Sequence, residues 1–212
     1  MISISITIPI IYTIILIASI TRSWLYNVVL PLKLCPFAYR PLVTHSSTEF
    51  TLTSADPTLP LSSLLRTLEL VSESTMSSPR STSIVVCAHP SLEDFVSYMD
   101  FVNGPVGSLP LVSEGKLQVA PFHPDFRFEG VDSGSVENFV NRSPYPMFHF
   151  LREDEVSGAV ERWGERGGKT EDIWVRNAEM MMFIGEEGCE RIKEKGGVDG
   201  HIMERIRDAG FG

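Results

Sequence analysis

The stretch IVVCAHPSLEDFVSYMDFV at residues 84–102 places an apolar run directly before a segment with helical periodicity. Residues 84–88 form a short run rich in β-branched side chains, which indicates a buried strand. Ser91 then provides a helix cap, with Asp94 three residues later. The apolar residues that follow recur at helical spacing, namely Leu92, Phe95, Val96, Met99 and Val102. A strand followed by an amphipathic helix is typical of α/β proteins.

The alternation of strands and helices extends along the chain on both sides of this stretch. We expect helices over residues 23–30, 61–71, 153–163 and 171–184, and further strands over 49–53, 116–122 and 147–150. Residues 72–83 are rich in serine and read as a linker, and residues 123–146 form a long loop. The sequence therefore predicts an α/β (or α+β) fold, a single sandwich domain with a mixed sheet of about four strands and helices packed on it.

The first 21 residues contain no charged side chain, and Arg22 ends this run. About 18–20 apolar residues reach across a bilayer, so residues 2–20 are a candidate membrane anchor. Pro9 interrupts the helix pattern, and a removed targeting leader or a mispredicted start codon are the alternatives. We divide the chain into a hydrophobic leader or membrane anchor (1–22), a domain (23–185) and a loosely held polar tail (186–212).

Charge and cysteine content restrict the partners and the compartment. The net charge is −9; residues 91–212 carry 13 Lys/Arg against 23 Asp/Glu, or −10. An acidic domain repels phosphate backbones, which argues against a nucleic-acid partner. The cysteines are odd in number and lack CxxC or zinc spacing, which fits a reducing compartment, whether the chain is membrane-anchored or organelle-targeted. The sequence has no GxGxxG or phosphate loop, and the cofactor is unknown.

Four short motifs carry a family resemblance: LCPFA at 34–38, FHPDF at 122–126, NRSPYP at 141–146 and HFLRE at 149–153. With QVA at 118–120 and the pair Arg176-Asn177, they make the chain similar to the family known as domain of unknown function 1415. The resemblance covers about residues 23–185. It implies one domain but no reaction, because that family has no established reaction.

His123 and His149 lie at the two ends of the long loop, and Glu153 follows shortly after. Neutral imidazoles move protons near neutral pH, so these three residues are the candidate catalytic groups. A metal site of two histidines and one carboxylate is an alternative, although the spacing matches no known signature. A third alternative is that each histidine anchors the loop by bonding backbone carbonyls. We expect both imidazoles to face one cleft.

Arg142 and Arg152 are the candidate anion-binding groups, because a guanidinium pairs bidentately with carboxylate or phosphate. Either arginine is equally well explained as a brace that ties the loop to a carboxylate. Asn141, Tyr145 and Cys35 complete the candidate ligand-binding set. For Cys35, a buried structural thiol, a residue that lines the site and a nucleophile all stay open.

Two functions fit these residues. The first is a small-molecule enzyme that acts on an anionic substrate through an Arg/His pocket, and the second is a non-catalytic ligand-binding or assembly module. The enzyme requires His123, His149 and an arginine to converge. The assembly module requires them to lie apart, beside a contiguous exposed apolar patch. The expected partners are a small anionic molecule and a membrane, whereas substrate, reaction and oligomeric state are not indicated.

Overall fold

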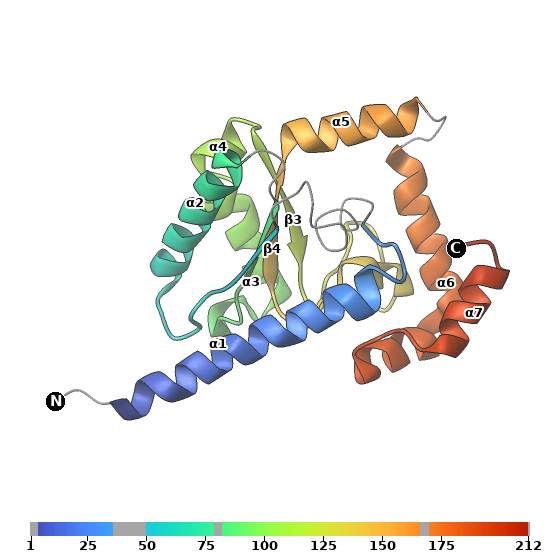
Figure 1. Ribbon diagram of the computed structural model, residues 1–212, viewed down its shortest axis with the longest axis horizontal. Helices are drawn as coiled ribbons and strands as arrows, with labels where there is room; N and C mark the ends of the chain where they lie inside the picture. The colour runs from blue at the N-terminus through green and yellow to red at the C-terminus, as the bar shows by residue number, and fades with distance from the viewer. Residues whose placement is uncertain (1–3, 36–49, 79–81, 166–169, 212) are drawn as a thin grey trace.

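The computed structural model of the chain describes residues 4–35, 50–78, 82–165 and 170–211. Figure 1 shows the arrangement of its elements. The α-helices are α1 (Ile4–Trp24), α2 (Leu61–Ser77), α3 (Phe95–Phe101), α4 (Pro110–Ser113), α5 (Glu153–Gly164), α6 (Thr170–Lys195) and α7 (Gly200–Asp208). The strands are β1 (Phe50–Ser54), β2 (Thr82–Val86), β3 (Leu117–Phe122) and β4 (Met147–Arg152). Short 3₁₀ or π-helical turns are η1 (Leu25–Val29), η3 (Pro90–Leu92), η4 (Val102–Val106) and η5 (Val136–Asn141).

The four described strands form one mixed sheet in the order β1-β2-β4-β3. β1 and β2 are parallel, whereas β4 pairs antiparallel with both β2 and β3. A parallel pair needs a crossover connection, and α2 supplies it between β1 and β2. The predicted class, an α/β or α+β fold with a mixed sheet of about four strands and packed helices, is confirmed.

The sheet lies between two helical layers (Figure 1). Successive strand residues point to opposite faces of the sheet, so each face contributes its own side chains to one layer. One face packs against α2, α3 and η4 through Val85, Phe148 and Phe150. The other face packs against α1, η1, α6 and α7 through Ile84 and Met147. These two sides are called the α2/α3 layer and the α1/α6 layer below. Each histidine of the candidate site must therefore belong to one layer or the other.

α2 is longer than the sequence suggested. It continues through the serine-rich segment to Ser77, where we expected a linker from residue 72 onward. The hydroxyl of Ser72 donates to the Glu69 carbonyl at 2.6 Å, and the hydroxyls of Thr75 and Ser83 lie 2.7 Å apart. Hydroxyl side chains that bond the preceding helical turn or a neighbouring strand fit inside a helix, so serine content alone did not end it.

The helix after β2 also begins later than predicted. Asp94, and not Ser91, caps α3, and its carboxylate accepts a hydrogen bond from the Ser97 amide at 2.8 Å. Residues 90–92 instead form the short turn η3, in which the imidazole of His89 accepts from the Ser91 amide at 3.0 Å. The hydrogen bond to Ser97 lowers the pKa of Asp94, which keeps the cap ionised.

Both ends of the chain are more closely tied to the core than we expected. α1 crosses the predicted boundary at residue 22 without a break and continues into η1. At the other end, Ile192, Ile202 and Ile206 are at most 2% exposed and belong to the α1/α6 layer. Residues 186–211 therefore pack on the domain, which differs from a loosely held tail. The division at residues 22 and 185 itself stays a prediction.

Candidate functional site

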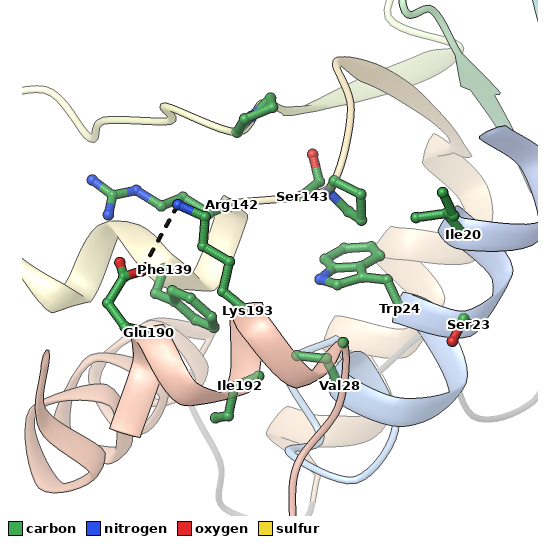
Figure 2. Close-up of a pocket in the computed structure, with 13 residues that line it drawn as sticks. Ile20, Ser23, Trp24, Val28, Phe139, Arg142, Ser143, Glu190, Ile192 and Lys193 are labelled. Carbon is green, nitrogen blue, oxygen red and sulfur yellow. Dashed lines mark ion pairs between the residues drawn. The ribbon is translucent and has the colours of Figure 1, made fainter. Parts of the chain in front are cut away.

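A pocket of about 340 Å³ lies on the α1/α6 side, where three segments far apart in sequence meet. Figure 2 shows Trp24 of α1 facing the turn after η5, with the end of α6 closing the lower side. The lining residues are Ile20, Ser23, Trp24, Val28, Pro124, Phe139, Arg142, Ser143, Pro144, Glu190, Ile192, Lys193 and Gly196. Most of these side chains are apolar.

Hydrogen bonds fix the turn at residues 142–144 against the end of β3. The His123 amide donates to the Asn141 carbonyl at 3.3 Å, and the Ser143 amide donates to the His123 carbonyl at 3.4 Å. The Ser143 hydroxyl donates to the Tyr145 carbonyl at 2.7 Å. Pro144 restricts the backbone further, because its ring fixes φ. The pocket wall formed by this turn is thus rigid before any ligand binds.

Three charged side chains lie on the pocket lining. The guanidinium of Arg142 donates to the Ser133 carbonyl at 2.8 Å and to the Phe126 carbonyl at 3.4 Å. Figure 2 shows this group directed away from Trp24. Lys193 and Glu190 form an ion pair at 3.9 Å, and both side chains are more than half exposed. Arg142 is thus a brace of the loop, as one alternative held, but its partners are neutral carbonyls, which leave its positive charge unpaired by a carboxylate in these contacts.

The two candidate histidines contact opposite layers, so the expectation of one shared cleft is wrong. The His123 ring packs against Phe95 and Tyr98 of the α2/α3 layer. The His149 ring is on the other face, near Phe122. The reason is the pleat: His149 alternates with Phe148 and Phe150, which occupy the α2/α3 layer.

Both imidazoles are buried and already hydrogen-bonded. His123 Nε2 lies 3.0 Å from the Leu92 carbonyl, and its Nδ1 accepts from the Asp125 amide at 3.0 Å. His149 Nε2 lies 2.7 Å from the Thr82 hydroxyl. Burial lowers the pKa of His123 and lowers that of His149 to about 4. His123 thus anchors the loop to backbone groups, as the third alternative held.

Arg152 and Glu153 lie at the far end of β4 from Arg142. The strand from Met147 to Arg152 is about 17 Å long at about 3.4 Å per residue. Arg152 pairs with Asp154 at 2.6 Å and donates to the Met76 carbonyl at 2.8 Å. The hydrogen bond from Arg152 lowers the pKa of Asp154. Arg152 is therefore a brace between β4 and the end of α2.

Glu153 has a local structural role. Its carboxylate accepts hydrogen bonds from the Gln118 side chain at 2.5 Å and from the Ser157 hydroxyl at 2.7 Å. These contacts join the start of α5 to β3. Both carboxylate oxygens of Glu153 are thus used in structural hydrogen bonds at the start of α5.

The remaining candidates hold the backbone or fill the core. The Asn141 side chain donates to the Pro121 carbonyl at 3.2 Å. Tyr145 and Cys35 are partly buried against the α1/α6 layer. All eight candidates lie within the described residues, and Arg142 is the one that lines the pocket.

The structure also shows what the motif pair Arg176-Asn177 contacts. The Asn177 side chain donates to the Leu34 carbonyl at 2.8 Å, and Arg176 donates to the carbonyls of Leu32 at 3.1 Å and Phe211 at 2.8 Å. α6 thereby holds the segment that leads into Cys35 and also the end of the described chain. These motif residues fix the α1/α6 layer around the pocket.

Sequence reasoning missed three of the residues that shape the pocket. Trp24 lies within the helix expected over residues 23–30 but was not among the candidate residues, and Glu190 and Lys193 lie in the segment that we expected to be loosely held. The signal available for the C-terminal segment was the spacing of the apolar residues Ile192, Ile202 and Ile206 around the Asp199 cap. This spacing indicates helices that pack on a core. Within the described ranges, no group of three or more His, Cys, Asp or Glu side chains is placed to hold a metal ion.

The fold and the pocket define an α/β sandwich protein with a small apolar cavity closed by its first helix and by the end of α6. The chain belongs to the family described as Protein of unknown function (DUF1415), whose model matches residues 16–191. The match includes the second half of α1 and most of α6, the two helices that line the pocket. Searches of curated proteins and of solved structures found no match.

Proposed function

We propose that this protein is a non-catalytic binding module for a small, largely apolar molecule that carries one anionic group. The observation that carries the proposal is the pocket between α1, the 142–144 turn and the end of α6. Its volume of about 340 Å³ lies at the lower end of the range of about 300–1,000 Å³ that is typical of small-molecule sites.

The lining suits an apolar body with one polar end. Trp24, Val28, Phe139 and Ile192 supply apolar surface from three segments. Trp24 is itself held by an edge-to-face contact with Phe122, at 5.9 Å between ring centroids. An aromatic ring fixed in this way offers a preformed surface for a ligand, so little ordering energy is lost on binding.

The charges favour an anion over a cation. Arg142 and Lys193 bring two positive charges to the lining against the one carboxylate of Glu190. The Lys193–Glu190 pair is long and exposed, and such pairs contribute little stability, so Lys193 is free to exchange its partner for a ligand. Arg142 adds positive potential without moving, because backbone carbonyls hold its guanidinium.

The enzyme hypothesis receives less support from the same geometry. It relied on His123 and His149 in one cleft with an arginine, and the two rings contact opposite layers. Acid–base catalysis at the pocket would need a further titratable side chain on the lining, beside Lys193 and Glu190. A binding role requires only the cavity and its charges.

The test uses two fluorescent probes that share an aromatic body. 1-Anilinonaphthalene-8-sulfonate carries an anionic sulfonate, and N-phenyl-1-naphthylamine lacks it. We expect the pocket to bind both and to prefer the sulfonate. Lys193→Gln should weaken sulfonate binding about fivefold, because one exposed charge pair at about 4 Å in water is worth about 1 kcal/mol. Glu190→Gln should strengthen it by a similar factor.

The matched control is Lys195→Gln, on the same helix but outside the lining. It should change neither affinity, and neither pocket variant should change binding of the uncharged probe. Equal affinities of wild type, Lys193→Gln and Glu190→Gln for the sulfonate would refute the anion preference. Absence of binding of both probes would refute the binding function.

A further inference from the structure

The first helix carries an apolar surface that the domain leaves uncovered. Ile11, Tyr12, Ile15 and Leu16 are each at least 50% exposed. Figure 1 shows the first half of α1 projecting beyond the body of the molecule. At about 100° per residue these side chains, together with Ile20, spread over about half of the helix circumference. Contiguous exposed apolar surface of this kind marks an interaction site.

A lipid bilayer fits this surface better than a protein groove does. Residues 1–21 contain no charged side chain, and Ile10–Val29 is long and apolar enough to cross a membrane, a test that core helices and signal sequences also pass. A helix that pairs with a second copy buries a narrow stripe, whereas α1 is apolar over a wide arc. Arg22, exposed six residues beyond Leu16, is placed to contact lipid phosphate.

The packing of α1 limits how far it can enter the bilayer. Ile17, Thr21 and Trp24 are buried in the α1/α6 layer or beside it, so this half of the helix belongs to the domain. The remaining residues, 4–16, are about 20 Å long at about 1.5 Å per residue, against about 30 Å of hydrocarbon. The projecting half is thus too short to span a bilayer while the domain stays folded.

We propose that α1 enters a single leaflet of a lipid bilayer and holds the folded domain at the membrane surface. Residues up to Leu16 lie in the lipid, and Arg22 lies at the headgroups. This inference is independent of the ligand pocket. It replaces a spanning anchor by a helix that is embedded at one end and part of the domain core at the other.

The first test is flotation of the full chain with vesicles of phosphatidylcholine that contain a minor fraction of phosphatidylserine. Wild type should float with the vesicles. Ile15→Glu/Leu16→Glu should reduce partitioning by about a hundredfold or more, because carboxylates are costly in hydrocarbon. The control Leu70→Glu/Val96→Glu adds the same charges at exposed apolar positions outside α1 and should still float. If wild type does not float but forms a dimer that Ile15→Glu/Leu16→Glu dissociates, a second copy covers α1 and the proposal fails.

The second test measures depth. Leu16→Trp on vesicles should be quenched best by lipids brominated near the headgroup, and Ile11→Trp by lipids brominated deeper in the chain, after subtraction of the wild-type tryptophan signal. A spanning α1 would place residue 16 near the bilayer centre. Strongest quenching of Leu16→Trp by the deepest bromines would therefore overturn the single-leaflet arrangement.

Discussion

His149 makes the stability of this protein depend on pH in a calculable way. Its ring is buried on the α1/α6 face of β4, beside Ile84 in the sheet register. The Thr82 hydroxyl lies 2.7 Å from His149 Nε2 and donates to the Phe150 carbonyl at 3.1 Å. With its one proton used there, the Thr82 oxygen accepts from Nε2–H. Burial lowers the pKa of His149 to about 4.

The sign and size of the effect follow from linkage. Below pH 6.5 the unfolded chain binds a proton at His149, whereas the folded protein does so only near pH 4. The contribution of His149 to stability is therefore complete above pH 6.5 and is lost as the pH falls to 4. A difference of about 2.5 pH units at about 1.4 kcal/mol per unit gives roughly 3 kcal/mol.

The assay is urea unfolding of wild type and His149→Gln between pH 7 and pH 4, followed by circular dichroism. Carboxylates and the other histidines titrate in both proteins, so the difference in unfolding free energy isolates His149. We expect the advantage of wild type to shrink by roughly 3 kcal/mol over this range. The control is Ile84→Val, at the neighbour of His149 on the same face of the sheet. This substitution should lower the free energy of unfolding by about 1 kcal/mol at every pH. A wild-type advantage that stays constant with pH would show that His149 does not titrate differently in the folded and unfolded protein.

Two further predictions concern buried polar groups. Tyr98→Phe should lower the free energy of unfolding by about 2 kcal/mol, because the buried hydroxyl donates to the Met147 carbonyl at 2.7 Å and accepts from a β3 amide at 3.0 Å; a loss below about 0.5 kcal/mol in urea unfolding would contradict this. Burial raises the pKa of Cys87 well above its usual value and that of Cys189 to about 12. In the native protein at pH 8, Cys35 should thus react first with a disulfide reagent, and fast reaction of Cys87 would count against the structure.

The regular elements of the core could be predicted because their signals are local. The β-branched run at residues 84–86 forms the last three residues of β2, and the leucines of α2 recur at the spacing that buries one face. The order of the strands is different in kind. β2 lies between β1 and β4 because of pairings between residues far apart in sequence, such as Ile84 with His149, and no local pattern encodes them.

The expectation that His123 and His149 share one cleft was wrong because it depended on the directions of their side chains, which the residue types alone do not give. The parity of β4 already places His149 opposite Phe148 and Phe150, so its face could be predicted from alternation. His123 lies just beyond the end of β3, where the hydrogen bonds of the 142–144 turn decide its direction. Closeness in sequence was therefore a poor guide to closeness in space.

The pocket could not be predicted from the sequence for a different reason. Its walls come from Trp24, Arg142 and Lys193, which are separated by more than fifty residues in each case and share no motif. The cavity exists because α6 and α7 pack on the domain instead of extending away from it. Arg176 and Asn177 hold that packing through the carbonyls of Leu32 and Leu34.

Binding of an apolar anion by the pocket beside Trp24 is tested most directly by the affinity of the sulfonate probe, without lipid, for wild type and three variants. Ser23→Trp adds a ring at an exposed lining position and should abolish binding, whereas Tyr26→Trp places the same indole in η1, outside the lining, and should leave the affinity unchanged. Ile15→Glu/Leu16→Glu should also bind as wild type does. Binding that survives Ser23→Trp but disappears in Ile15→Glu/Leu16→Glu would place the probe on the exposed face of α1 and contradict the account.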